Sequence, residues 1–222
     1  MRTINFDWKP LVLVPLLAVL VMPLIVSPST WLTLTVAGLA MGMIIFIIAS
    51  GLTLVFGLMD VLNFGHGVFI ALGAFVATSV MGAMGDWTSS DQLWRNLVAV
   101  FPAMLIAMAV AGAVGLAFER FIVRPVYGQH LKQILITMGG MIIGEELIKV
   151  IWGPAQIALP LPEAMRGSLY VGDAAIEKYR LMAVVVGLAV FATLAWVLSR
   201  TKIGLLIRAG VQDREMVESL GY

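Results

Sequence analysis

The chain has 222 residues, of which 61% are hydrophobic and 12% are charged, whereas a soluble domain carries about 25% charged residues. Its mean hydropathy is +1.01 and its net charge is +1. This composition excludes a soluble enzyme, a disordered chain, a coiled coil and a collagen-like fibre, and gives no reason to expect a polyanion-binding surface. Long apolar runs also exclude an outer-membrane barrel, whose strands alternate apolar and polar residues.

The chain contains no cysteine and has two histidines, His66 and His130. Disulfides and thiolate metal sites are therefore excluded, and two histidines alone do not predict a metal centre. We expect neither a metal nor a cofactor.

Long stretches without Asp, Glu, Lys or Arg predict membrane-spanning helices, and the longest such run is 10–59. A spanning helix needs about 20 apolar residues. Lipid offers no partner for backbone N–H and C=O groups, so spanning segments must be helical. We predict an all-α, polytopic transmembrane helix bundle with six spans, near 11–27, 31–53, 65–84, 97–118, 132–152 and 181–199.

The Lys and Arg residues between these spans predict the orientation. If the N-terminus is cytoplasmic, most of the 14 Lys and Arg residues fall on the cytoplasmic side, and residues 153–180 lie outside. The first span resembles a secretion signal. However, Asp7 interrupts its basic region, and residues 27–30 lack a small-x-small cleavage pattern, so we predict an uncleaved span.

Segment 51–67 allows two interpretations. Residues 31–59 as one helix would measure roughly 43 Å, against a hydrocarbon core of about 30 Å, so we expect a break near Ser50-Gly51. The glycines of the segment could then support a broken or re-entrant element that presents Asn63 and His66 to cargo. Spacing alone favours the other interpretation, a tight cytoplasmic turn in which Asn63 caps the third span and a backbone carbonyl satisfies His66.

An intramembrane enzyme is a third hypothesis for this segment, with Asp60, Asn63 and His66 as an acid/base cluster. Asp60 and His66 are six positions apart, so the two do not share a helical face. No nucleophile lies within reach by spacing, and the sequence does not favour this hypothesis.

Small residues recur four apart in two predicted spans, as Gly38-x-x-x-Gly42 and Gly140-x-x-x-Gly144. Two small residues on one helical face let helices approach closely. This spacing indicates a packed bundle rather than isolated anchors, and it carries no information about cargo.

The fifth predicted span contains three ionisable residues, Glu145, Glu146 and Lys149. Glu145 and Lys149 are four apart in the order that favours an ion pair, so we predict a structural pair between them. Glu146 lies on a different face and is left unexplained. The alternative is a channel or secondary carrier that has Glu145 and Lys149 in its pathway.

The tail, 201–222, follows the last span directly. Val211, Met216, Val217 and Leu220 can form an apolar stripe, and Gly221 suits a helix end. A short amphipathic helix of this kind docks into a groove of a partner or lies on the inner membrane surface.

Two of these segments resemble a known family. Asn63-Phe64-Gly65-His66-Gly67, followed by Gly73-Ala74, resembles the signature of branched-chain amino acid ABC transporter permeases, and is most similar to the LivH-type subunit. The tail resembles the cytoplasmic coupling segment of that family, and Glu215 and Gly221 keep the Glu-x-x-x-x-x-Gly spacing of the wider importer loop. Members of the family continue past this segment with further spans, which the present sequence does not contain.

The resemblance implies a single transmembrane permease domain over 1–222, with a cytoplasmic coupling segment at 200–222, in the bacterial inner membrane. It implies a permease subunit of an ABC importer that moves branched-chain or similar small amino acids. The same architecture also serves urea and short amides. The implied substrate-pathway residues are Asn63, Phe64, Gly65, His66 and Gly67. The implied ATPase-coupling residues are Gly204, Arg208, Ala209, Asp213, Glu215 and Gly221.

The resemblance also implies the partners: a second permease subunit, two cytoplasmic ATPase subunits and a periplasmic amino-acid-binding protein. ATP hydrolysis is then expected on the ATPases, and this chain is not expected to be an enzyme. Consistent with that expectation, the sequence has no phosphate-cradling Gly-x-x-x-x-Gly-Lys-(Ser/Thr) loop.

Overall fold

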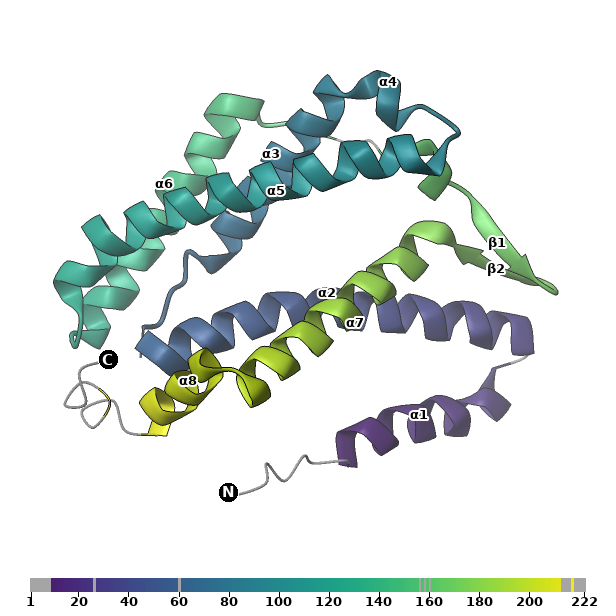
Figure 1. Ribbon diagram of the computed structural model, residues 1–222, viewed down its shortest axis with the longest axis horizontal. Coiled ribbons are helices and arrows are strands. Elements are labelled where there is room, and N and C mark those ends of the chain that lie inside the picture. Colours follow the sequence, from purple (N-terminus) through teal and green to yellow (C-terminus); the bar gives the residue numbers. More distant parts are fainter. Residues whose placement is uncertain are drawn as a thin grey trace. The chain divides into compact units, whose positions relative to one another are not determined.

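A computed structural model describes residues 9–212, except 26, 60, 156, 158 and 160, and also residue 217. Most of the described chain is helical (Figure 1). The longer helices are α1 (Lys9–Val21), α2 (Pro28–Met59), α3 (His66–Ala83), α5 (Leu93–Phe118), α6 (His130–Trp152), α7 (Lys178–Arg200) and α8 (Lys202–Gln212). The shorter elements are η1 (Met22–Leu24), α4 (Gly85–Thr88), the π-helical η2 (Glu119–Val123), η3 (Arg124–Val126), η4 (Glu163–Met165), β1 (Ser168–Val171) and β2 (Ala174–Glu177).

Within the described residues, four helical segments are long and apolar enough to cross a membrane: Pro28–Gly57, His66–Ala83, Leu93–Val126 and Lys178–Arg200. The apolar segment of the first helix, Val12–Leu24, is shorter. Helix α6 has 23 residues but carries four charged ones: Lys132, Glu145, Glu146 and Lys149. The prediction of a helical, multi-pass membrane protein is therefore confirmed. The number of six spans and the cytoplasmic N-terminus stay predictions.

The predicted break near Ser50-Gly51 is wrong. Helix α2 runs without interruption through both residues as far as Met59. A glycine inside a helix costs only about 1 kcal/mol relative to alanine, which packing can offset. A helix longer than the hydrocarbon core can be accommodated by tilting.

Local sequence explains where α1 ends and α2 begins. Pro23 cannot donate a backbone hydrogen bond and disfavours the helical conformation of the residue before it, so α1 ends at Val21. Ser27 then caps α2, because its Oγ accepts the backbone N–H of Thr30 at 3.2 Å. Pro28 occupies the first helical position, where its missing N–H costs nothing.

The chain divides into two compact units. One unit ends at Ile45 and resumes over Gly167–Ala189; the other covers Phe46–Arg166 and resumes at Val190. Helices α2 and α7 each contribute residues to both units. The candidate site lies wholly in the second unit.

The first unit contains a β-hairpin that the sequence analysis did not predict. Strands β1 and β2 are antiparallel, with Ser168 opposite Glu177 and Val171 opposite Ala174. Ala174 and Ile176 are buried on β2, whereas the β1 side chains from Leu169 to Val171 are exposed. The Thr33 hydroxyl of α2 donates to the carbonyl of Ala175 at 3.3 Å and so ties the hairpin to that helix.

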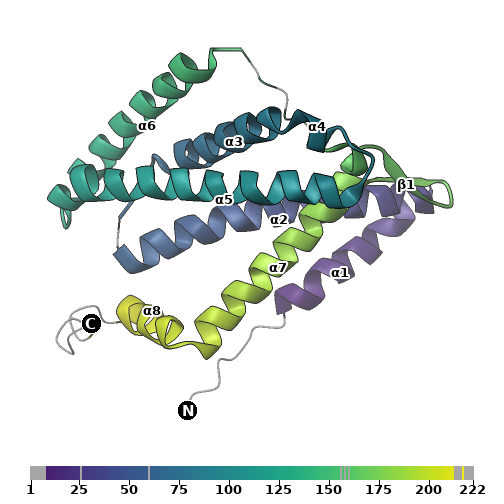
Figure 2. The same cartoon turned by 45° about the horizontal axis from the view of Figure 1, so that its top comes forward.

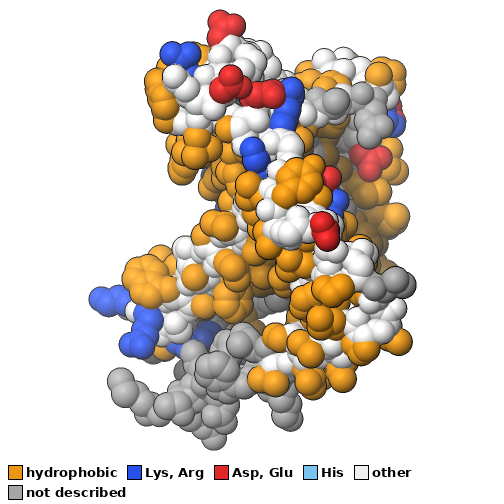
Figure 3. All heavy atoms as spheres, turned by 90° about the vertical axis from the view of Figure 1, so that its right-hand side faces the viewer, with side chains coloured by type: hydrophobic (Ala, Val, Ile, Leu, Met, Phe, Trp, Pro, Cys, Tyr) orange, Lys and Arg blue, Asp and Glu red, His pale blue; other side chains and the backbone are white. Residues whose placement is uncertain are grey.

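The second unit is built around α3, α5 and α6, which lie side by side (Figures 1 and 2). Ala99, Ala103 and Ala107 are buried at four-residue spacing along α5, which allows close packing of backbones. Outside such contacts the helices present hydrophobic side chains, which cover most of the face in Figure 3. Apolar surface on this scale is what a lipid-facing bundle needs.

Candidate functional site

The segment 61–67 is a tight turn that connects α2 to α3. Asn63 closes the turn: its Oδ1 accepts the backbone N–H of Gly65 at 2.9 Å, and its carbonyl accepts the N–H of His66 at 3.3 Å. Acceptance by Asn of the N–H two residues later is an Asx turn. The predicted capping of the third span by Asn63 is wrong in this respect: the N-cap residue of α3 is Gly65, which has no side-chain cap, and Asn63 closes the turn before the helix.

The imidazole of His66 reaches back across the turn to α2. Its Nε2 lies 3.3 Å from the carbonyl oxygen of Ile48. Because a carbonyl can only accept, this hydrogen bond requires the proton on Nε2. The predicted satisfaction of His66 by a backbone carbonyl is therefore confirmed, and the arrangement does not present a free acid/base pair.

Helix α6 holds the turn from the other side. Thr137 is fully buried, and its hydroxyl lies 3.2 Å from the carbonyl of Leu62 and 2.7 Å from that of Gln133. Val61 is 2% exposed, so the entry to the turn is packed as well. Sequence reasoning missed Thr137, because a threonine within an apolar span gives no signal of a long-range contact.

The remaining predicted pathway residues differ in their surroundings. Gly65 is buried, and a Cβ placed there would lie 3.1 Å from Asn63 Oδ1 and 3.6 Å from the carbonyl of Thr137. Phe64 is half exposed, and no atom in the described part of the chain comes within 4 Å of a Cβ added at Gly67. The turn thus has an anchored side at Asn63, Gly65 and His66 and an open side at Phe64 and Gly67.

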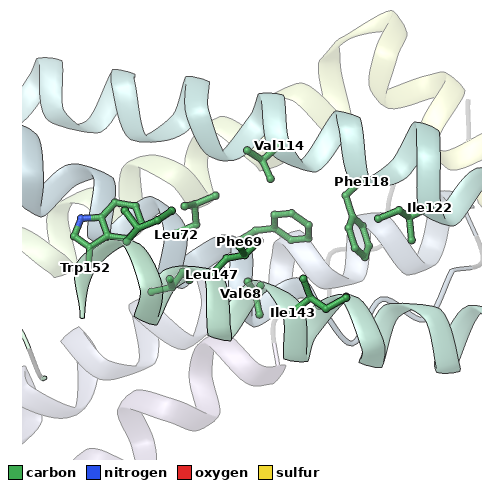
Figure 4. A pocket seen from close by; sticks show the side chains of 14 residues that line it. Val68, Phe69, Leu72, Val114, Phe118, Ile122, Ile143, Leu147 and Trp152 are labelled. Carbon is green, nitrogen blue, oxygen red and sulfur yellow. The ribbon is translucent and has the colours of Figure 1, made fainter. Parts of the chain in front are cut away.

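An apolar groove of 330 Å³ begins beside the turn and runs between α3, α5 and α6 (Figure 4). Gly65 contributes to its lining, and in Figure 4 Trp152 lies at one end of the groove while Phe118 and Ile122 lie at the other. Trp152 is held in place there because its Nε1 donates to Ser79 Oγ at 2.7 Å. The lining side chains are hydrophobic, so the groove suits an apolar group rather than a charged one.

The Gly140-x-x-x-Gly144 spacing produces the close approach that it predicts. A Cβ at Gly140 would lie 2.4 Å from a ring carbon of Phe118, and a Cβ at Gly144 would lie 2.5 Å from a methyl of Val68. Only glycine fits at these two positions without displacing a neighbour. At Gly38 and Gly42, by contrast, the described residues leave open space.

The prediction of a Glu145–Lys149 pair is wrong. Lys149 Nζ lies 2.6 Å from Glu146 Oε1, three residues before it in α6. Spacings of three and four both bring side chains together on a helix, and spacing alone could not decide between the two acids. Glu145 is exposed and has no ion-pair partner among the described residues.

The predicted coupling segment begins as helix α8. Thr201 caps it, because the hydroxyl of Thr201 accepts the backbone N–H of Gly204 at 3.1 Å. Gly204 is buried in the corner between α7 and α8, where a Cβ would lie 2.3 Å from the carbonyl oxygen of Val197. Arg208 donates through Nε to the carbonyl of Gly204 at 3.2 Å, and Ala209 is half-buried.

Helix α8 also contacts the end of α2. The nearest atom to a Cβ added at Gly57 is a methyl of Val211, at 3.6 Å. The other residues predicted for coupling, Asp213, Glu215 and Gly221, lie outside the described residues, as does Asp60 of the enzyme hypothesis.

Taken together, the apolar helices, the anchored turn and the terminal helix α8 define a multi-pass α-helical membrane protein. Residues 34–222 match the family described as branched-chain amino acid transport system / permease component. The chain belongs to this family. Its relatives are permease components of transporters rather than enzymes, and the resemblance drawn from the sequence is confirmed.

Similar curated proteins carry matching names. The chain is 28% identical over 195 residues to the high-affinity branched-chain amino acid transport system permease protein BraD of Pseudomonas aeruginosa, which covers 84% of this chain and 61% of BraD. It is 27% identical over 190 residues to the permease protein LivH of Salmonella typhimurium and of Escherichia coli, covering 83% of this chain and 60% of each relative. No solved structure matches significantly.

Proposed function

We propose that this chain is a permease subunit of an ATP-binding-cassette importer that moves branched-chain amino acids across the bacterial inner membrane. The observation that carries the proposal is the family match over residues 34–222. The chain spans about three fifths of the length of the relatives, so the complete activity is inferred from the family rather than from this chain alone.

The turn at 61–67 is proposed to border the substrate pathway. Its anchored side, through Asn63, Gly65 and His66, fixes the backbone between α2 and α3. Its open side, through Phe64 and Gly67, is available to cargo. The geometry supports a positioning role for Asn63 and His66, because both side chains are occupied by hydrogen bonds within the chain.

Helix α8 is proposed to start the cytoplasmic segment that transmits movement from an ATPase. Three features support this role: its separate cap at Thr201, the tight corner at Gly204 and the exposed hydrophobic side chains of Ile203, Leu205 and Val211. A rigid corner lets a push on α8 reach α7 directly. Asp213, Glu215 and Gly221 are proposed to extend the same segment.

The partners that the proposal requires are a second permease subunit, two cytoplasmic ATPase subunits and a periplasmic amino-acid-binding protein. The proposed orientation has the N-terminus in the cytoplasm, so α8 lies on the ATPase side and the β-hairpin on the periplasmic side. Nucleotide chemistry belongs to the ATPases.

Reconstitution of the complete importer in proteoliposomes tests the proposal. Uptake of leucine, isoleucine or valine should require ATP inside, the binding protein outside and this chain in the membrane. Uptake of urea or a short amide under the same conditions, without amino acid uptake, would assign the alternative cargo. Uptake without ATPases and binding protein would instead indicate a channel or carrier.

A further inference from the structure

The charged residues of α6 lie on a face that no described element covers. The opposite side of the helix packs against its neighbours through Gly140, which meets Phe118, and Gly144, which meets Val68. At about 100° per residue, Glu145, Glu146 and Lys149 project away from those two glycines. All three charged side chains are exposed.

Lipid is an unfavourable environment for this face of α6. Lys149 and Glu146 neutralise each other at 2.6 Å, but Glu145 has no ion-pair partner among the described residues, so the group retains one uncompensated negative charge. In the predicted span 132–152, which this inference takes to cross the membrane, Glu145 lies seven residues before Trp152, or about 10 Å from the end of the helix, and a short side chain does not reach the interface from there. Ionised groups at such depth face water, a protein interior or a substrate path.

The same face carries apolar side chains immediately before the charges. Met138 and Ile142 are four residues apart, and Ile142 precedes Glu145 by three and Glu146 by four, so they form one stripe. Met138 and Ile142 are both exposed. The stripe therefore presents an aliphatic surface, an anion and a cation in succession along one helix.

An α-amino acid with an aliphatic side chain has the complementary set of groups. We propose that this stripe of α6 faces the aqueous cargo path and binds the zwitterion in transit. The Glu145 carboxylate accepts a hydrogen bond from the cargo ammonium group, and the Lys149 ammonium donates one to the cargo carboxylate. Ile142 and Met138 contact the aliphatic side chain of the cargo. A lysine ammonium has three donors, so Lys149 can keep Glu146 while it binds cargo. This inference rests on the proposed transport of amino acids.

Because the chain has no native cysteine, single-cysteine variants can test whether water, lipid or another protein lies against this face of α6. In the assembled importer in membranes, a membrane-impermeant thiol reagent should modify Ile142→Cys about tenfold or more faster than Ile143→Cys, because the reactive thiolate forms in water and not in hydrocarbon. Ile143 is the matched control, since it lies on the groove side of the same helix. Leucine delivered by the binding protein should slow the reaction at Ile142→Cys.

Equal rates at the two cysteines would overturn the inference. A disulfide between Ile142→Cys and the second permease subunit, without protection by leucine, would also overturn it and show that a protein covers the face.

Charge variants give a second, independent readout. Glu145→Gln and Lys149→Gln should each lower the maximal leucine uptake about tenfold or more, as expected for the loss of one charge-assisted hydrogen bond. Lys149→Arg, which keeps the charge, should retain most of the uptake. ATPase stimulation by the binding protein should persist in all three variants, which a merely structural role would not predict.

Normal uptake by Glu145→Gln overturns the inference while the proposed function stands. A wild-type complex that shows no ATP-dependent amino acid uptake overturns the proposed function, and this inference with it.

Discussion

The imidazole ring of His66 occupies the space that a side chain at Gly51 would need. A Cβ added to Gly51 would lie 3.3 Å from Cε1 and 3.5 Å from Nε2 of that ring. The absence of a side chain on α2 therefore lets the first residue of α3 reach the Ile48 carbonyl. A glycine in the middle of a long helix and a histidine fifteen residues later form one contact that fixes the angle of the turn.

Replacement of Gly51 by leucine should displace His66 and destabilise the protein. Both Gly51→Leu and the control Gly42→Leu gain less than about 1 kcal/mol of helix propensity. Only Gly51→Leu adds overpacking of about 1–3 kcal/mol and loses the hydrogen bond. Thermal unfolding in detergent should therefore place Gly51→Leu below Gly42→Leu, and identical melting temperatures would contradict the contact.

This contact illustrates why part of the fold was predictable and part was not. Helices overlap all six predicted spans, because charge-free runs leave the backbone no alternative in lipid, although only four helical segments of the described chain are long and apolar enough to cross a membrane. The prediction of a break at Ser50-Gly51 was wrong because it rested on helix length and glycine content, which take no account of contacts with other helices. The His66 ring that packs against Gly51 belongs to another helix, and the sequence of α2 alone does not predict this contact.

The same distinction applies to the site. The sequence predicted that a backbone carbonyl satisfies His66, and it placed Asn63 in a tight turn, although the side chain of Asn63 closes that turn and does not cap α3. Partners that depend on rotamer choice or on tertiary contact could not be predicted: Lys149 pairs with Glu146, and Thr137 reaches Leu62 from a separate helix. The β-hairpin was missed because its strands have only four residues each, too short for a clear alternation.

Asn96 should be a major determinant of stability at the start of α5. It is fully buried, its amide donates to the carbonyls of Trp87 at 3.0 Å and Ser90 at 2.7 Å, and its Oδ1 accepts the N–H of Ala164 at 2.9 Å. Asn96→Leu leaves these part-buried backbone groups without Asn96 as partner, at up to about 1–3 kcal/mol for each one that water does not reach.

We therefore expect Asn96→Leu to lower the melting temperature clearly and to speed hydrogen exchange at Ala164. The exposed neighbour Gln92 provides the control, since Gln92→Ala should change the unfolding free energy by about 0.5 kcal/mol or less. Slow exchange at Ala164 in Asn96→Leu would mean that another group holds the 163–165 turn.

Two glycines in α6, Gly139 and Gly144, allow a matched test of helix packing. Gly144→Ala places a Cβ 2.5 Å from a Val68 methyl, whereas no described atom lies within 4 Å of a Cβ added at Gly139. Gly139→Ala should stabilise the helix by up to about 1 kcal/mol. Gly144→Ala should instead destabilise by about 1–3 kcal/mol, because α3 must move or Val68 must change rotamer.

Chemical or thermal unfolding of the two variants, measured side by side in one detergent, distinguishes the effects because the substitution and the helix are the same. Equal stabilisation by both alanines would show that α3 does not pack on Gly144 as described.

The corner between α7 and α8 should be required for coupling to ATP rather than for folding of the spans. A Cβ at Gly204 would lie 2.3 Å from the Val197 carbonyl oxygen and 2.5 Å from the Leu198 Cα, and these backbone atoms cannot move aside as a side chain can. Gly204→Ala should therefore re-aim α8, while Gly210→Ala in the same helix meets no described atom within 4 Å and serves as the control.

In the reconstituted importer, we expect Gly204→Ala to lower ATP-driven uptake about tenfold or more and to weaken copurification of the ATPases, because a misdirected helix cannot enter a preformed groove. The melting temperature of the spans should change little, since α8 follows α7 and is not itself one of them. Full uptake by Gly204→Ala would show that the direction of α8 is not needed to couple the ATPases to transport. Loss of uptake with unchanged ATPase binding would move the defect from docking to the transmission of movement through α7.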